Sequence, residues 1–405
     1  MNKITVCVVT GARSEYGLMR WLMEDLKNSS DFTLKLIAVG SHLSKKYGNT
    51  FKEIEADGFE IDKKIPFTVD PINAKSIGKV TGDLTASLVE TFEDFKPDLI
   101  LVMGDRYELL SVLSSSILST IPVAHISGGE ITEGAIDDQI RHAMTKISHL
   151  HYVANEVYKE RVLQMGEENW RVLVCGEPGL DNLQRQEMMS KVDLEKDLDI
   201  DLSKPTALVT YHPVTLEIKD LDYQIKELVG AMEVLSVDND LQFVITYPNS
   251  DEGSQLIIDS WKSFVTNSRE RVLIKSLGQK RYLSALKYMS VLIGNSSSGL
   301  VEAPSFGLPV INIGNRQGGR IRGKNVIDVD YNSSSIIKAT QKILKNSKKE
   351  SYFNPYGNGN ASRKILDHIL FSFREKGRDR IISKKFIDSG SVTKIEQNFK
   401  KKYGH

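Results

Sequence analysis

The sequence predicts an α/β protein with two doubly wound, mostly parallel sheets. Short, continuously apolar runs alternate with helix-length segments over most of the 405 residues, which is typical of buried parallel strands joined by helical crossovers. The length suits roughly two domains of ~100–200 residues each. Turn residues after Cys175 and a charged stretch up to Pro205 interrupt the alternation once. We therefore expect an N-terminal domain at 1–185, a C-terminal domain at 186–372, a cleft between them, and a basic tail at 373–405.

Each expected strand is a short run of apolar and β-branched residues closed by turn or charged residues. The runs are 4–9, 33–39, 99–103, 123–126, 152–154 and 172–175 in the first domain, and 207–211, 243–247, 272–275, 291–293 and 310–313 in the second. Apolar residues spaced by three or four positions predict helices, most clearly at 77–95 and also at 218–235, 283–289 and 336–344. The basic tail shows no strand pattern, so we expect a solvated helix or a frayed end.

The composition excludes several classes of protein. The 53 Lys and Arg residues balance the 53 Asp and Glu residues, and a formal net charge of zero argues against a protein that coats nucleic acid or an anionic membrane. The N-terminal apolar run is followed at once by Arg13 and Glu15, which favours a strand over a signal peptide. No run approaches the ~20 apolar residues of a membrane helix, and two cysteines cannot build a disulfide framework. We expect a soluble, cytoplasmic protein without nucleic-acid or membrane partners.

Open α/β sheets bind ligands at the carboxyl ends of their strands, so the loops that follow strands are where chemistry is expected. The loop at 10–17 carries glycines but lacks the Gly-x-Gly-x-x-Gly spacing of dinucleotide-binding folds, and no P-loop motif occurs. His149 and His151 stand far from both cysteines, without the spacing of a tetrahedral metal site. We expect no nicotinamide, no metal and no other cofactor.

In the second domain, the loop at 294–299 reads Gly-Asn-Ser-Ser-Ser-Gly between a strand and a helix. Amides, hydroxyls and the helix dipole together suit a phosphate, although a plain capping cluster has the same composition. Arg316 and Arg320 follow the next strand and bring guanidinium groups, which match phosphate geometry, to the same edge. His212 also ends a strand, where ligand binding competes with a structural role. The pattern suggests a domain that holds a nucleoside diphosphate.

In the first domain, carboxylates follow two neighbouring strands. Asp105 and Arg106 end the very apolar run at 99–103, and Glu130 and Asp137 follow the run at 123–126. Carboxylates gathered in a closed cleft can have their pKa values pushed apart, which yields one acid and one base. Helix capping is the competing explanation for Asp137.

A series of motifs in order along residues 13–360 resembles one known family. It includes Ser-His-Leu at 41–43, Tyr-Gly-Asn-Thr at 47–50, Gly-Asp-Arg at 104–106, Gly-Gly-Glu at 128–130, Ile-Asp-Asp at 136–138, Ile-Arg-His at 140–142, His-Pro-Val-Thr at 212–215, Pro-Asn-x-Asp at 248–251, Gly-Asn-Ser-Ser at 294–297, Pro-Val-Ile-Asn at 309–312 and Gly-x-Arg-Gln at 314–317. These residues resemble the hydrolysing UDP-N-acetylglucosamine 2-epimerases of sialic acid and related nonulosonate pathways. The resemblance implies a GT-B-like fold of two Rossmann-type domains, with UDP held mainly by the second.

The resemblance also implies a reaction and a set of roles. UDP-GlcNAc and water would give UDP and ManNAc, through anti elimination of UDP to a 2-acetamidoglucal and hydration with inversion at C2. Asp105 and Asp137 would be the acid–base carboxylates, with Arg141 nearby and Glu130 as a further catalytic candidate. The residues implied in binding the nucleotide sugar are Arg13, His42, Arg106, His212, Asn249, Asp251, Ser296, Ser297, Glu302 and Arg316. Relatives commonly form dimers or tetramers, so a homo-oligomer is expected.

Arg13, Arg316, His212 and the serine-rich loop are expected to neutralise charge on the departing UDP. Carboxylates can move the C2 proton once C1 has oxocarbenium character.

One departure puts the substrate in doubt. Relatives typically have a catalytic glutamate just before Gly-Gly-Glu, where this chain has Ser127, and an extra residue lies in the segment 131–136. Either Glu130 or Glu133 replaces that carboxylate, or the pocket is built for another sugar, for which UDP-N,N′-diacetylbacillosamine is the leading candidate. UDP-GlcNAc is slightly preferred.

Three functions compete with the hydrolysing epimerase. A GT-B glycosyltransferase would share the fold and the UDP-binding domain but would need an acceptor. A non-hydrolysing epimerase would retain UDP on its product. A sugar-nucleotide sensor would bind UDP without turnover.

Overall fold

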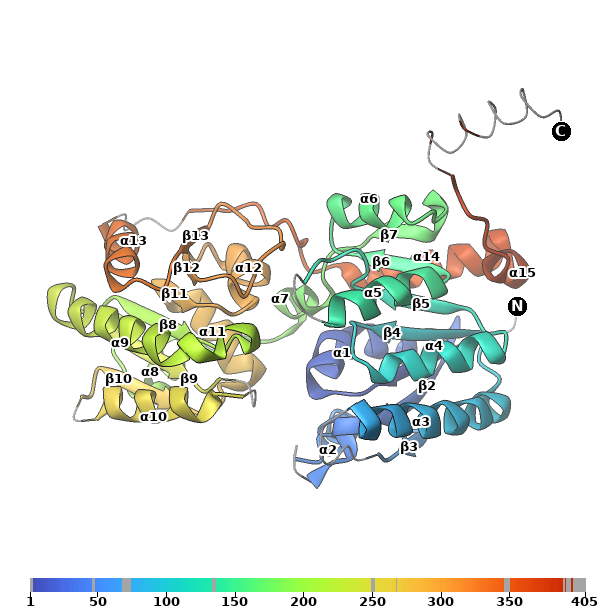
Figure 1. The fold of residues 1–405 in the computed structure, drawn as a ribbon, viewed down its shortest axis with the longest axis horizontal. Coiled ribbons are helices and arrows are strands. Elements are labelled where there is room, and N and C mark those ends of the chain that lie inside the picture. The colour runs from blue at the N-terminus through green and yellow to red at the C-terminus, as the bar shows by residue number, and fades with distance from the viewer. Residues whose placement is uncertain are drawn as a thin grey trace. The chain divides into compact units, whose positions relative to one another are not determined.

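The computed structural model describes residues 3–45, 48–67, 74–132, 136–248, 252–266, 268–345 and 350–388, with 390 and 395. The chain forms two compact units. The first consists of residues 1–131, 135–182 and 356–405, and the second contains residues 183–355. Each unit is one parallel sheet with helices on both faces, so the α/β class and the two Rossmann-type sheets predicted from the sequence are confirmed (Figure 1).

The sheet of the first unit has seven parallel strands in the order β3-β2-β1-β4-β5-β6-β7. Their bounds are β1 (Ile4–Thr10), β2 (Phe32–Val39), β3 (Lys63–Ile65), β4 (Leu99–Met103), β5 (Val123–Ile126), β6 (Leu150–Val153) and β7 (Val172–Val174). The strand order reverses between β1 and β4, and loops after both strands lie at the carboxyl edge, where such sheets bind ligands.

Helices cover both faces of this sheet. They are α1 (Arg13–Asn28), α2 (Phe51–Ala56), α3 (Ala74–Phe95), α4 (Glu108–Leu118), α5 (Ile136–Ile147), α6 (Glu156–Gln164), α14 (Ala361–Phe371) and α15 (Arg378–Ile382). One core joins the sheet to α1 and α14, and another joins its opposite face to α3, α4 and α5. Helix α7 (Asn182–Arg185) spans the passage to the second unit.

The second unit has six parallel strands in the order β10-β9-β8-β11-β12-β13. They are β8 (Thr206–Thr210), β9 (Gln242–Thr246), β10 (Arg271–Ile274), β11 (Val291–Gly294), β12 (Val310–Ile313) and β13 (Val326–Val329). The helices are α8 (Lys191–Leu198), α9 (Leu221–Asp238), α10 (Ser254–Val265), α11 (Gly278–Tyr288), α12 (Ser298–Val301) and α13 (Ser333–Lys345). Here α9, α10 and α13 share one core, and α8 and α11 share the other.

The expected strands are all present within one or two residues of their predicted bounds. Two strands, β3 and β13, were not predicted. Both are edge strands of three or four residues, and neither is a continuously buried run, because Lys63 and Lys64 are exposed and Asp328 interrupts β13. The apolar-run criterion finds strands that are covered on both faces, so it misses edges of this kind.

The end of the predicted second domain belongs to the first unit. Helix α14 packs Ile365 and Ile369 into the core that contains α1, and the fully buried Asp181 carboxylate accepts the backbone N–H groups of Ala361 and Ser362, each at 2.8 Å. The second unit ends at Pro355, not at residue 372. Helical spacing shows that α14 has an apolar face but does not say which sheet it covers.

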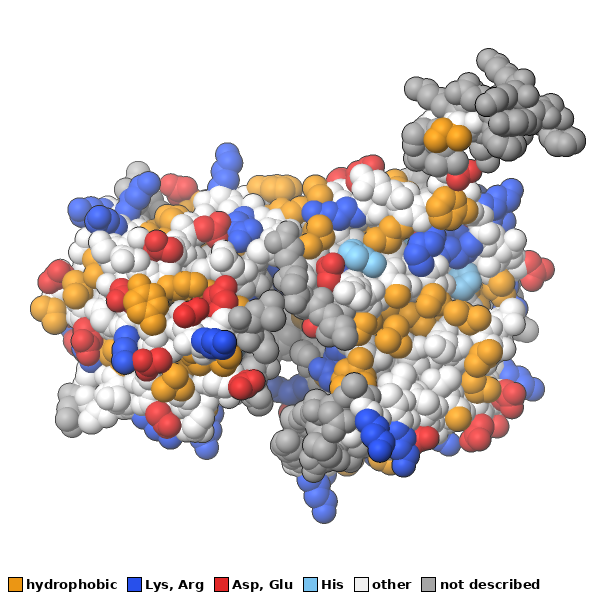
Figure 2. All heavy atoms as spheres, viewed as in Figure 1, with side chains coloured by type: hydrophobic (Ala, Val, Ile, Leu, Met, Phe, Trp, Pro, Cys, Tyr) orange, Lys and Arg blue, Asp and Glu red, His pale blue; other side chains and the backbone are white. Residues whose placement is uncertain are grey.

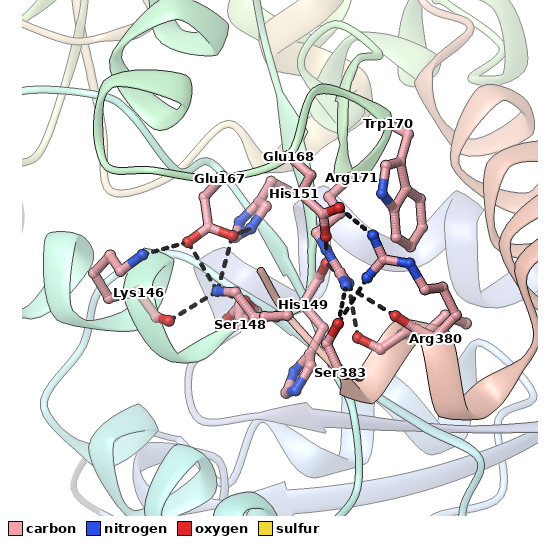
Figure 3. A network of polar contacts seen from close by, with 12 residues as sticks. Lys146, Ser148, His149, His151, Glu167, Glu168, Trp170, Arg171, Arg380 and Ser383 are labelled. Carbon is pink, nitrogen blue, oxygen red and sulfur yellow. Dashed lines mark hydrogen bonds and ion pairs between the residues drawn. The ribbon is translucent and has the colours of Figure 1, made fainter. Parts of the chain in front are cut away.

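The predicted solvated tail is wrong for its described part, which is docked on the first unit (Figure 3). Arg171 is fully buried and donates to the carbonyl oxygens of Arg380 at 2.9 Å, Ile381 at 2.7 Å and Ser383 at 3.2 Å. A buried guanidinium needs several acceptors, and the carbonyls at the end of α15 supply them. The attraction is therefore between Arg171 and the backbone of the tail, which charge composition does not reveal.

Lys384 makes a second anchor. Its Nζ donates to the carbonyl oxygens of Lys146 at 2.9 Å and Ser148 at 2.6 Å, and to Glu167 Oε1 at 2.8 Å. The ammonium group thus caps the C-terminal end of α5, where a positive charge is favourable. Three hydrogen bonds, from Lys146, Lys384 and His151, hold the pKa of the buried Glu167 at about 2 although burial alone would raise it.

Acidic and basic side chains are mixed over both units on the face shown in Figure 2, rather than gathered in one basic patch. Within the described ranges, no helix is long and apolar enough to cross a membrane.

Candidate active site

The first unit brings Asp105, Asp137 and Arg141 together at the carboxyl edge of its sheet. Asp105 follows β4 through Gly104, whose φ of +90° favours glycine. Asp137 and Arg141 lie one turn apart on α5, and Arg141 forms an ion pair with Asp105. The Arg141 side chain is only 5 % exposed, so the pair is largely shielded from water on one side. Three residues predicted from separate motifs are thus neighbours.

The pKa of Asp137 is raised above its ordinary value. Partial burial is the largest cause, the nearby Asp105 carboxylate adds to it, and Arg141 and Arg106 oppose it. Two carboxylates that share a small volume repel each other, and one of them then holds its proton to higher pH. This unit therefore holds two neighbouring carboxyl groups, one with a raised pKa and one fixed by an arginine.

His125 braces the turn that carries Asp105. It is fully buried on β5, and its Nε2 lies 2.9 Å from the Gly104 carbonyl oxygen. Burial lowers the pKa of His125 to about 3, so the ring is neutral, and its Nε2 must carry the proton because a carbonyl only accepts. From the sequence, His125 lies in the polar cluster that ends this apolar strand, and no role was predicted for it.

The backbone amides of the turn between β1 and α1 are hydrogen-bonded within the chain. Glu15 Oε2 accepts the backbone N–H groups of Gly11 at 2.8 Å and Ala12 at 3.3 Å. Arg13 starts α1 and pairs its Nε with Glu53 at 2.7 Å, largely exposed. The amides that a Rossmann fold would offer to a pyrophosphate are therefore already bonded here, and Arg13 is the group that remains accessible.

Two further candidates in this unit are buried. His42 places Nε2 at 3.0 Å from Thr10 Oγ1 and Nδ1 at 2.9 Å from Thr50 Oγ1, and burial lowers its pKa to about 4. Both ring nitrogens are engaged within the unit, so its predicted contact with the ligand stays a prediction. Glu130 is 6 % exposed, and its catalytic role also stays a prediction. Glu133 lies outside the described residues.

In the second unit, Asn295 organises three loops. Its side chain accepts the backbone N–H of His212 and donates to the His212 carbonyl, both at 2.8 Å, which ties the loop after β8 to the loop after β11. The backbone carbonyl oxygen of Asn295 accepts hydrogen bonds from Arg316 Nη1 at 3.1 Å and Gln317 Nε2 at 2.9 Å, both in the loop after β12. Asn295 is fully buried. We did not select it, although an amide between a glycine and three serines after a buried strand was a usable signal.

The serine loop lies on this scaffold. Gly294 must be glycine, because a Cβ there would stand 2.0 Å from the Thr210 carbonyl oxygen. Ser296 and Ser297 are half-buried at the start of α12. Burial raises the pKa of Glu302, and the Ser298 hydroxyl and the Arg320 charge oppose this rise. Hydroxyls, a carboxyl group and arginines therefore gather at one edge, as the sequence predicted. Asn249 and Asp251 lie outside the described residues.

The structure corrects the expected charge of one residue. Burial, with the Arg316 charge as a smaller cause, lowers the pKa of His212 to about 3. A neutral imidazole can donate or accept a hydrogen bond but adds no positive charge, so His212 does not help to neutralise a departing diphosphate.

Comparison with known proteins identifies the family. Residues 24–370 match the family described as UDP-N-acetylglucosamine 2-epimerase. The chain belongs to this family. It is 40% identical over 389 residues to the GDP/UDP-N,N′-diacetylbacillosamine 2-epimerase (hydrolyzing) of Campylobacter jejuni, covering 96% of this chain and 100% of that protein. It is 36% identical to the UDP-N,N′-diacetylbacillosamine 2-epimerase (hydrolyzing) of Legionella pneumophila, covering 89% and 93%.

A third relative is the polysialic acid biosynthesis protein P7 of Escherichia coli, with 36% identity over 92% of this chain and 95% of that protein. Among solved structures, the UDP-GlcNAc 2-epimerase from Neisseria meningitidis bound to UDP-GlcNAc matches with a TM-score of 0.74 and 21% identity, over 91% of this chain and all of that one. This likeness shows the fold that family members share, and the GT-B-like fold class predicted from the sequence is confirmed.

Proposed function

We propose that the protein is a hydrolysing nucleotide-sugar 2-epimerase that acts on UDP-N,N′-diacetylbacillosamine. The observation that carries the reaction class is the Asp105–Arg141 ion pair beside Asp137 in a member of this epimerase family. Acid–base chemistry at a sugar carbon needs two proton-transferring groups with different pKa values. Asp137, whose pKa is raised, holds the proton, and Asp105, fixed by Arg141, takes one from C2.

The steps balance without any redox partner. Removal of the C2 proton and cleavage of the C1–O bond release UDP and leave a C1–C2 double bond. Water then adds at C1, and a proton adds at C2 from the opposite face, which gives the free 2-epimer. Arg13, Arg106 and Arg316 oppose the charge that develops on the leaving diphosphate. Ser296, Ser297, neutral His212 and Glu302 hold the nucleotide by hydrogen bonds.

The choice of sugar rests on two supports. Two relatives with 40% and 36% identity are named for diacetylbacillosamine, and Ser127 stands where the resemblance places a glutamate. UDP-GlcNAc is the second candidate, since the N. meningitidis serogroup B UDP-N-acetylglucosamine 2-epimerase is 31% identical over 85% of this chain. That the protein forms a homo-oligomer stays a prediction, whichever of the two sugars is the substrate.

Proton NMR in D2O, with the purified protein and no added metal or nicotinamide, tests the proposal. We expect UDP to accumulate with a free 2-epimer that carries deuterium at C2, faster from UDP-N,N′-diacetylbacillosamine than from UDP-GlcNAc. The same assay with the GDP-linked sugar tests which nucleotide the enzyme accepts. Faster turnover of UDP-GlcNAc would reverse the substrate assignment. Silence with every donor, and turnover only after an acceptor is added, would replace the epimerase by a glycosyltransferase.

A further inference from the structure

A buried carboxylate pair lies beside the candidate active site and has no part in the proposed reaction. Glu15 is 7 % exposed and Glu108 is 1 % exposed. They come from α1 and α4, and each helix follows a central strand of the sheet. Oxygen Oε1 of Glu15 and Oε2 of Glu108 are buried and, within the described parts of the chain, have no hydrogen-bond partner. Buried carboxylate oxygens without partners are costly, so this arrangement calls for an explanation.

One guanidinium stands between the two carboxylates. Arg106 Nε lies 2.5 Å from Glu108 Oε1 and 3.9 Å from Glu15 Oε1. The Arg106 side chain is still 41 % exposed, so it remains accessible to a ligand. Glu15 also closes the turn that carries Arg13, and Gly11 packs against Glu108, where a Cβ would come within 2.7 Å of Oε1. The cluster thus joins the loop of Arg13 to the loop of Asp105 and Arg106.

We propose that Glu15 is a positioning residue that sets how strongly Arg106 and Arg13 bind the diphosphate of the nucleotide sugar. When Glu15 is neutral, the cluster of Glu15, Arg106 and Glu108 carries no net charge. When Glu15 is ionised, the cluster is negative, holds Arg106 more firmly and repels a diphosphate. This inference rests on the proposed function, because it takes a diphosphate sugar as the ligand.

The groups around Glu15 place this change near neutral pH. Burial is the main cause that raises the pKa of Glu15 to about 7, and the Glu108 charge adds to it, while the amides of Gly11 and Ala12 and the charge of Arg106 oppose it. His42, which packs near Arg106, is neutral over this range because its pKa is about 4. On the element of Glu15 itself, Arg13 is paired with Glu53.

Steady-state kinetics between pH 5.5 and 8.5 test the proposal with the nucleotide sugar that the enzyme turns over. A nucleotide sugar has no terminal phosphate group, so it loses no proton near pH 6 as free UDP does. We expect KM of the wild type to rise roughly five- to tenfold as the pH passes through about 7. In Glu15→Gln, KM should stay near its low-pH value throughout, with kcat changed far less than KM.

Two further variants complete the test. Glu108→Gln removes a like charge, so the rise in KM should move to lower pH, and this result supports the proposal even if Glu15→Gln does not fold. Glu55→Gln removes an exposed carboxylate that pairs with Lys64 on the same unit and should follow the wild type. If the wild type turns over the nucleotide sugar and Glu15→Gln shows the same dependence of KM on pH, this inference alone is overturned. If neither the wild type nor any variant turns over a nucleotide sugar, the proposed function is overturned instead.

Discussion

The candidate groups at the two sheet edges are held in different ways. In the first unit, charged side chains are held by other charged side chains: Arg141 by Asp105, Arg106 by Glu108, and Arg13 by Glu53. In the second unit, three loops are joined by a single neutral residue, Asn295, through hydrogen bonds to backbone and side-chain groups. One edge is an array of paired charges, and the other is a hydrogen-bonded frame.

We propose that the difference corresponds to two tasks. Moving a proton needs carboxyl groups with different pKa values and fixed positions, and neighbouring charges supply both. Holding a nucleotide needs many donors in a fixed shape, and a rigid hydrogen-bonded frame reduces the ordering cost of binding. We therefore expect substitutions of Asp105 and Asp137 in the first unit to change rates, substitutions around Arg106 to change how affinity depends on pH, and substitutions in the second unit to change affinity itself.

The largest effect should follow loss of the Asp105 carboxylate. Asp105→Asn keeps the shape of the side chain but removes its ability to take a proton, so kcat should fall by ~10²–10⁴-fold, while the Kd for UDP, measured by calorimetry, stays within about twofold. Asp138→Asn, one residue along α5 from Asp137, is the matched control. A variant with wild-type turnover would remove Asp105 from the mechanism, and a large loss of UDP affinity would contradict the division of tasks.

The next effect concerns the brace on the far end of α5, the helix that carries Asp137 and Arg141. Lys384→Met removes the ammonium that caps this helix and leaves Glu167 with one buried partner fewer, so the unfolding free energy should fall by about 2–4 kcal/mol. Urea denaturation measures it. Arg374 lies in the same C-terminal segment as Lys384 and forms an exposed ion pair with Asp31. Arg374→Gln breaks this pair and should lower the unfolding free energy by less than about 1 kcal/mol. Equal losses in both variants would show that Lys384 is not a special anchor.

Strands with continuous apolar runs could be predicted, including the edge strands β7 and β10, whereas the edge strands β3 and β13 and the buried braces could not. Continuous apolar runs mark strands such as β4 and β11 because both of their faces are covered by helices. The loops that follow them are then placed by topology, which is why the sequence could place the candidates Asp105 and Ser296 at the carboxyl edges of their sheets. Lys384 and Glu15 were missed for a common reason. Their partners are backbone groups and distant side chains, and no local pattern records which carbonyls a buried charge will meet.

A smaller effect is expected from the second unit. Arg316→Ala removes a guanidinium that is steadied by the Asn295 carbonyl at 3.1 Å. Loss of a charge-assisted hydrogen bond to phosphate is worth about 1.5–3 kcal/mol, so the Kd for UDP should rise roughly 10- to 100-fold. Turnover at saturating substrate should change much less. Arg322→Ala, whose side chain pairs with Asp328, is the control. If kcat falls while UDP still binds with its normal affinity, Arg316 belongs with the catalytic group rather than the frame.

The smallest effect tests whether the paired charges of the first unit reduce its stability. The pKa of Glu15 is about 7 in the folded protein against an ordinary value of 4.5, so the folded state binds more protons between these two values. The contribution of Glu15 to the unfolding free energy of the wild type then falls as the pH rises from about 4.5 to 7. Glu15→Gln cannot ionise and avoids this loss. We expect it to match the wild type at pH 4.5 and to be more stable by about 1–3 kcal/mol at pH 8, measured by urea denaturation at both pH values. A constant difference between the two proteins at both pH values would mean that folding does not raise the pKa of Glu15.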